Sequence, residues 1–180
     1  MAAPIKPRKV QANGKDSWYF VPTIAVPTTP TAAEVNTASG MNASCALLAS
    51  FEGVTGSTGK VTLERFLCET EQYEANDNTT FTMSDVVGGF DPQAAAEHND
   101  KKVFAFFKNG FTGYAVRRQG IVAANDTGVV AGQFVDVVPV QVAPAIPGKS
   151  NTDASGIYTF SAAVAVTGKP EFNVAVTPGS

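Results

Sequence analysis

The chain carries little charge. Asp, Glu, Lys and Arg make up only 16% of its 180 residues, and the formal net charge is −3. The usual charged fraction is ~25%. Proteins that bind nucleic acids in general present a basic face, which supplies most of their affinity. The composition therefore argues against a general nucleic-acid binder.

Histidine and cysteine are also scarce, with one histidine and two cysteines in the whole chain. His98 lies in the polar segment AEHND, and without a positioned nucleophile we interpret it as a solvated residue at a helix end. Cys45 and Cys68 could form one disulfide, but reduced cysteines in the core are the favoured interpretation. The sequence therefore predicts no enzyme, no metal site and no cofactor.

The chain has no apolar run of 18 residues, so no membrane-spanning helix is expected. The first residues, MAAPIKPRKVQ, have no hydrophobic signal core, and no Sec-type export is indicated. We interpret residues 1–11 as a flexible arm and residues 12–180 as one domain. A chain of this size buries roughly 70% of its unfolded surface and needs no disulfide or metal to fold.

The abundant residues are β-branched. There are 22 valines and 18 threonines but only four leucines, and β-branched side chains favour the pleated surface of a sheet over a helix. The sequence predicts a mainly β protein of seven or eight strands, a β-sandwich or small barrel with one short flanking helix and an extended N-terminal arm.

Local patterns suggest where the elements lie. Asn13-Gly14 predicts a type I′ hairpin turn, and the proline-rich segment 22–32 is extended and cannot be a central strand. Asp91-Pro92 and Gly110 predict the start and end of the helix. Thr31 and Glu34 could form a capping box, but a loop is as probable there. Strands are expected in these segments: 45–53, 61–76, 78–90 (broken at Gly88-Gly89), 111–123 and 132–142. Flexible loops are expected at 50–61 and 144–156.

The closing stretch, YTFSAAVAVTGKPEFNVAV from Tyr158 to Val176, alternates with a period of two, which predicts one kinked strand or two strands. One face is large and apolar. The other is small and neutral, with none of the Lys, Glu or Arg of a solvated sheet face; it comprises Thr159, Ser161, Ala163, Ala165 and Thr167. Uncharged strands of this kind are templates for pairing with another chain, so the pattern predicts an assembling protein.

Four glutamates, Glu64, Glu69, Glu71 and Glu74, fall within one expected strand. Neighbours on one strand do not face each other across a cleft, as a glycosidase pair must. A solvated edge is the favoured interpretation and a surface that repels anions is the alternative. Lys60 is followed by Val61, so the segment GVTGSTGK lacks the spacing of a phosphate-binding loop.

Two further clusters have structural interpretations. Arg117 and Arg118 are expected on opposite faces of a strand, paired with the glutamates. Trp18, Tyr19 and Phe20 could form a platform for carbohydrate, but packing in the core or of a docked arm is favoured.

Several segments taken together resemble the major tail tube proteins of long-tailed phages with actinobacterial hosts. They are PTAAEVNTASGMNASCALL, RFLCETEQYEANDNTTFTM, FTGYAVRRQG, AGQFVDVVPVQV and AVAVTGKPEFNVAV, in this order. The resemblance runs from about residue 15 to residue 177. It implies a β-sandwich-like or barrel-like subunit that forms sixfold rings, which stack into a hollow tube for DNA.

The resemblance also implies partners: a tape-measure protein inside the tube, a terminator protein at its end and an initiator complex on the baseplate side. It implies a virion tail assembled in the host cytoplasm. On this basis the four glutamates are candidates to line the lumen, where they would repel DNA that passes without specific binding. The small neutral face, together with Phe51, Val54 and Lys60 in loop 50–61 and the arm 1–11, is a candidate for contacts between subunits. A capsid decoration or other virion protein, and a carbohydrate-binding sandwich, are the alternatives.

Overall fold

The computed structural model describes residues 9, 11–68, 70–123, 127–151 and 156–179. Strands take up 43% of the chain and helices 9%, so the expected mainly β class is confirmed. Most of the expected N-terminal arm, residues 1–8 and 10, lies outside the described residues. No helix in the described ranges is long and apolar enough to cross a membrane.

The largest sheet is entirely antiparallel. Its strands are β1 (Asp16–Val21), β2 (Met41–Asn42), β6 (Phe111–Gln119), β7 (Phe134–Val142), β10 (Val164–Val166) and β11 (Glu171–Ala175). The order is β10-β7-β6-β1-β2, and β11 pairs with β7 beside β10. The closing stretch thus forms β10 and β11 here and β9 in another sheet, three strands where one or two were expected.

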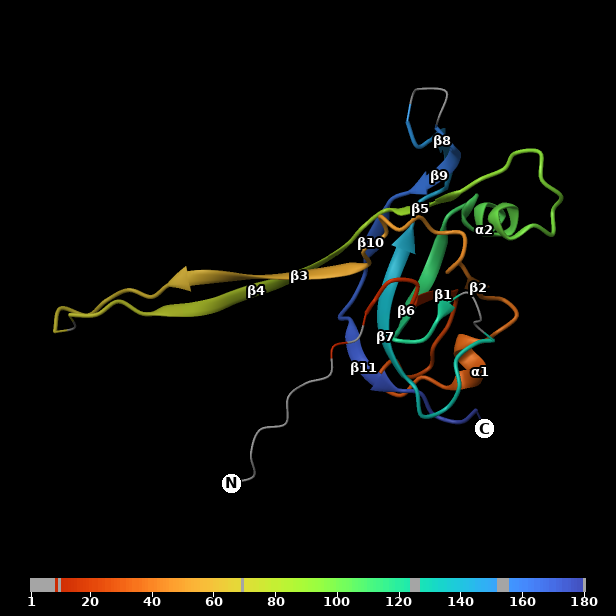
Figure 1. Ribbon diagram of the computed structural model, residues 1–180. Helices are drawn as coiled ribbons and strands as arrows, with labels where there is room; N and C mark the ends of the chain where they lie inside the picture. Colours follow the sequence, from red (N-terminus) through yellow and green to blue (C-terminus); the bar gives the residue numbers. More distant parts are fainter. Residues whose placement is uncertain (1–8, 10, 69, 124–126, 152–155, 180) are drawn as a thin grey trace.

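The centre of this sheet is buried on both faces, which explains why β1 has no polar side (Figure 1). Trp18 and Phe20 point into one core, and Tyr19 and Val21 point into the other. The favoured interpretation of the aromatic cluster as core packing is therefore confirmed, since all three rings are buried.

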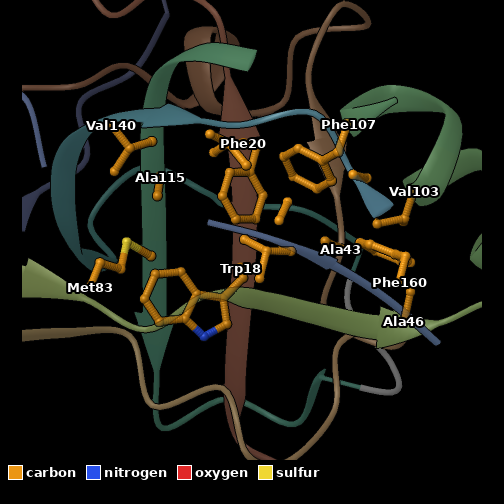
Figure 2. Packing of buried hydrophobic residues seen from close by; sticks show 14 of the residues in the cluster. Trp18, Phe20, Ala43, Ala46, Met83, Val103, Phe107, Ala115, Val140 and Phe160 are labelled. Carbon is orange, nitrogen blue, oxygen red and sulfur yellow. The ribbon is translucent and has the colours of Figure 1, made fainter. Parts of the chain in front are cut away.

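The first core lies between the main sheet, α2 (Asn99–Phe107) and a small sheet in the order β5-β9-β8. The small sheet consists of β5 (Val86–Gly89), β8 (Ile146–Lys149) and β9 (Tyr158–Ala162). Figure 2 shows Phe20 of β1 beside Phe107 of α2, whose ring centroids are 4.8 Å apart in an edge-to-face arrangement. Such pairs add about 1 kcal/mol beyond the area that they bury.

The second core lies on the opposite face and is covered by the short helix α1 (Ala32–Val35). The Thr31 hydroxyl accepts a hydrogen bond from the Glu34 backbone N–H, and the Glu34 carboxylate accepts one from the Thr31 N–H at 2.8 Å. This is a complete capping box, so the helical alternative left open by the sequence is correct. The chain therefore has two helices among its described residues where one was expected.

The remaining strands, β3 (Val54–Thr62) and β4 (Glu74–Met83), form a long hairpin that projects far from the body (Figure 1). Residues 54–61 of the expected loop 50–61 form β3 instead, and the expected strand 61–76 is wrong in its middle, where the described residues form the hairpin tip. The glycine- and serine-rich composition suggested mobility, but the threonines pair across the strands. The hydroxyls of Thr55 and Thr82 form a hydrogen bond of 3.0 Å, and those of Thr58 and Thr79 form one of 2.9 Å.

Three other expectations on loops and turns are wrong. Residues 45–53 form turns, not a strand. At Asn13-Gly14 only the glycine has a positive φ, of 69°, so the turn is not type I′, which needs both. The segment 144–156 is not loop throughout, because it contains β8; its residues 152–155 lie outside the described residues.

The helix begins later than the sequence predicted. The Asp91 carboxylate accepts a hydrogen bond from the Gln93 N–H. The Lys101 ammonium donates hydrogen bonds to the carbonyls of Pro92 and Ala94. These bonds hold the segment as turns, and α2 starts only after His98. The helix ends at Phe107 with Lys108 as its C-cap, and Gly110, with φ of 82°, follows two residues after the cap.

The expected break at Gly88-Gly89 is also absent, because both glycines lie within β5. A Cβ on Gly88 would lie 2.6 Å from the Phe160 ring, so the glycine permits close packing between β5 and β9. The break between β4 and β5 falls instead at Ser84-Asp85.

Candidate assembly surfaces

The β3–β4 hairpin, here called the arm, is the first candidate surface. Its strands of nine and ten residues reach about 30 Å at a rise of ~3.4 Å per residue. Nearly all of its side chains are exposed, and it lies apart from the other sheets. An isolated two-stranded hairpin is marginally stable in water, and bare strand edges pair readily with other chains.

The root of the arm is fixed to the body. Gly53 and Ser84 exchange two hydrogen bonds, from the Gly53 N–H to the Ser84 hydroxyl at 3.2 Å and from the Ser84 N–H to the Gly53 carbonyl at 3.1 Å. Phe51 packs edge-to-face on Trp18, with 4.8 Å between the ring centroids. The ring centroids of Phe81 and of Phe172 in β11 are 6.2 Å apart. These contacts set the direction in which the arm points.

The end of the arm carries large apolar side chains in water. Leu67 is fully exposed, Phe66 is 73% exposed, and Leu63 and Tyr73 are about half exposed. We call these four residues the knob. Exposed apolar groups gathered in one place mark interaction sites in soluble proteins.

The knob was missed by the sequence reasoning, although a signal was present. Phe66, Leu67 and Cys68 are consecutive apolar residues after the charged pair Glu64-Arg65. That order breaks the period of two on which the expected strand 61–76 depended.

The candidate glutamates lie at the same end of the arm. Glu64 and Glu71 are exposed at the tip, and Glu74 begins β4. Glu74 forms an exposed salt bridge of 3.4 Å with Lys60, a type of pair that contributes about 0–1 kcal/mol. Glu69 lies outside the described residues. The three described glutamates are therefore brought together by a hairpin end, not by the single strand that was expected.

The small neutral face of the closing stretch is the second candidate surface. Ser161, Ala163, Ala165 and Thr167 are exposed, whereas Thr159 is only 5% exposed and its side chain is unavailable to a partner. We therefore leave Thr159 out of this surface. Val54 and Lys60 lie in β3 of the arm, and Phe51 belongs to its root.

The neutral face continues across three strands. In the register of the main sheet, Thr112 of β6 pairs with Gln141 of β7, which pairs with Ala165 of β10. These three residues also line an open groove of about 560 Å³, which we call the β10 groove. It has no charged lining residue, and Phe111, Pro144 and Ala163 contribute to its walls.

Other residues singled out in the sequence do not form a reaction centre. Cys45 and Cys68 are free thiols and both are exposed, so the expectation that they are core cysteines is wrong. His98 is exposed at the N-cap of α2, as expected. In the part of the chain that the structure describes, no group of three His, Cys, Asp or Glu side chains could hold a metal ion.

The arginine pair stabilises the body. Arg117 forms a 2.9 Å salt bridge with Asp16 and lies over the Trp18 ring. Arg118 is buried and donates to the Gly128 carbonyl at 2.6 Å. The expected pairing of these arginines with the glutamates is therefore wrong for the three described glutamates, because these lie at the far end of the arm.

Comparison with known proteins identifies the family. The family described as "Phage tail tube protein" matches residues 3–179, nearly the entire chain. Among solved structures, the chain is similar to one in "Cryo-EM structure of the anti-feeding prophage (AFP) baseplate, 6-fold symmetrised", with a TM-score of 0.47 and 6% sequence identity. That match covers 95% of this chain and 96% of the other. No curated protein matches. Because the family match spans almost its full length, the chain belongs to the phage tail tube protein family, a family of structural proteins and not of enzymes.

Proposed function

We propose that this chain is the major tail tube subunit of a long-tailed phage with an actinobacterial host. Copies form sixfold rings, and the rings stack into a hollow tube that conducts DNA from the capsid to the host cell. The observation that carries this proposal is the family match over residues 3–179. A tail tube subunit is a component of the virion tail, which accounts for a chain that has surfaces for contact but no reaction centre among its described residues.

The distribution of surfaces in one chain supports self-assembly. The tip of the arm and the β10 groove are different surfaces of the molecule, so contact between them in two copies is head-to-tail. Head-to-tail contacts leave one free surface at each end of a growing assembly and produce closed rings or open filaments. A tube of stacked rings requires contacts of this kind.

The same proposal assigns the partners. A tape-measure protein lies within the growing tube, a terminator protein closes it, and an initiator complex on the baseplate side begins it, all in the host cytoplasm. The exposed arm supports a role for the initiator. A marginally stable hairpin with bare edges gains order on a template, so a template lowers the concentration at which free subunits assemble.

We further propose that Glu64, Glu69, Glu71 and Glu74 face the channel, where their negative charge repels the phosphates of passing DNA. The knob residues and the glutamates are interspersed in the sequence between Leu63 and Glu74. That arrangement allows the apolar side chains to contact protein while the carboxylates stay in water.

Negative-stain electron microscopy over a concentration series of the purified protein tests this function. Hollow tubes or stacked rings of uniform width are the expected result, and a reconstruction would give their symmetry. Monomers at every concentration, with or without preformed tail fragments as templates, would contradict self-assembly of this chain. Fivefold or eightfold rings would contradict only the sixfold arrangement.

A further inference from the structure

We infer that the knob at the end of the arm docks into the β10 groove of a second copy of this chain. The inference rests on the proposed function, because it names the two surfaces through which the subunits of the tube join. The contact joins the knob of one copy to the groove of the next. The knob comprises Leu63, Phe66, Leu67 and Tyr73, and the groove is lined in part by Thr112, Gln141 and Ala165.

The knob cannot reach the β10 groove of its own chain. The arm is rooted beside the closing strands, where Phe81 lies 6.2 Å from Phe172 and β4 contacts β10. Its paired strands carry the tip about 30 Å away from that root, and Figure 1 shows it pointing away from the body. The groove therefore lies near the base of the arm, and only another molecule can fill it with a knob.

The side chains of the knob fit the β10 groove in size and in polarity. A closed apolar cavity of about 150 Å³ holds one benzene ring, so the groove volume of about 560 Å³ suits roughly three large side chains. Its uncharged lining and small alanines allow rings and leucines to come close to the backbone. Burying an exposed Leu or Phe contributes about 1.5–3 kcal/mol each, which is the scale of interaction that a self-assembling contact needs.

Charge also distinguishes the β10 groove from a second groove on the body. Glu64 and Glu71 flank the knob, and both are exposed. The second groove, between Asn13, Phe51 and Leu48, includes Asp16 in its lining. The β10 groove has no charged lining residue, so, unlike the second groove, it holds no carboxylate that would repel the glutamates of the tip.

Cysteine cross-linking between two differently labelled variants tests the contact directly. One variant keeps the natural Cys68 beside the knob and carries Cys45→Ser. The other carries Cys45→Ser, Cys68→Ser and Ala165→Cys, which places a thiol in the β10 groove. A matched control partner has Ala49→Cys in place of Ala165→Cys, because Ala49 is an exposed alanine that lines the second groove.

The variants are mixed at a concentration that gives assemblies in the electron microscope and are then oxidised. We expect a disulfide between residues 68 and 165, identified by mass spectrometry of the linked peptides, at a yield at least tenfold above that with residue 49. An equal yield, a preference for residue 49, or tubes without either cross-link would overturn the inference. Tubes without the cross-link would leave the proposed function standing, whereas failure to form any assembly would count against that function instead.

A second variant checks that the knob drives association. Leu67→Ser removes a side chain that is fully exposed in the free subunit, so thermal unfolding of the monomer should be unchanged. The concentration needed for assembly should rise at least tenfold. Val26→Ser, at a half-exposed valine elsewhere on the body, is the control and should leave assembly unchanged. Equal effects from both substitutions would overturn the inference.

Discussion

At the scale of single residues, Glu34 links a local sequence signal to stability. Its carboxylate accepts hydrogen bonds from the backbone N–H groups of Ala25 and Thr31, both at 2.8 Å. The Ala25 bond is the largest cause, followed by that from Thr31, and together they hold the pKa of Glu34 below its ordinary value of 4.5. The charged form is therefore stabilised by folding, and its contribution is lost as the pH falls through the lowered pKa.

We expect Glu34→Gln to lower the free energy of unfolding by about 1 kcal/mol at pH 7, the typical worth of a helix N-terminal cap. The difference from the wild type should shrink at a second pH far below 4.5, because the wild-type carboxylate becomes neutral as the pH falls through its lowered pKa. Urea denaturation at both pH values measures this. Glu97→Gln, at an exposed glutamate, is the control, and a loss of stability that does not depend on pH would refute the assignment.

Gly53 is a second residue whose identity the structure explains. Its φ is 84°, a conformation that side chains with a Cβ rarely adopt, and an added Cβ would lie 2.5 Å from the Trp18 ring. Gly53→Ala should destabilise the chain by about 2 kcal/mol or more, from backbone strain together with displacement of Trp18.

Gly120→Ala separates these two causes. Gly120 has a φ of 85° but no atom within 4 Å of its added Cβ, so this substitution reports backbone strain alone. Thermal unfolding of both variants gives the comparison. If the two substitutions cost the same, contact with Trp18 contributes nothing at the root of the arm.

At the scale of elements, the body and the arm should be separable. The body has two cores and a central sheet, while the arm is exposed along nearly its full length. Ser57 and Thr80 are paired across the arm near its root. Replacing residues 58–79 with an Asn-Gly turn would close the hairpin there with a loop that suits paired strands.

We expect this shortened chain to unfold within about 2 °C of the wild type, because no core residue is removed, but to form no tubes. Circular dichroism with heating measures the first result and electron microscopy the second. Normal tubes from the shortened chain would show that the arm takes no part in assembly. Loss of the folded body would show that the arm stabilises the subunit itself.

At the scale of the whole molecule, charge should control the passage of DNA if the glutamates face the channel. Glu64→Lys combined with Glu71→Lys would place cations where the proposal puts a repelling wall. Tubes of this variant should retain DNA at low salt and release it at high salt, since screening and counterion release weaken phosphate contacts.

The measurement is DNA co-sedimentation with preformed tubes between 50 and 500 mM salt, on the order of the range over which such contacts weaken. Glu97→Lys on the body is the matched control. Equal retention by both variants would show that the tip glutamates do not line the channel. Retention only by the double variant would support the channel assignment.

The sequence by itself determined the composition-dependent features of this protein. An excess of valine and threonine over leucine fixes a mainly β fold, because side-chain branching acts at each residue. The capping residues of α1, the glycine that follows α2 and the strands β6 and β7 follow from short local patterns. The neutral face of the closing stretch could be seen as well, since alternation needs no knowledge of partners.

Only the tertiary structure decided which segments pair. The run GVTGSTGK forms a strand because its threonines meet those of β4, 27 and 21 residues later, and local propensity does not contain such a non-local contact. The three described glutamates and the knob lie at one end of the arm for the same reason. The burial of Thr159 and the exposure of Ala165 depend on which sheets cover each strand, and that arrangement exists only once the whole chain has folded.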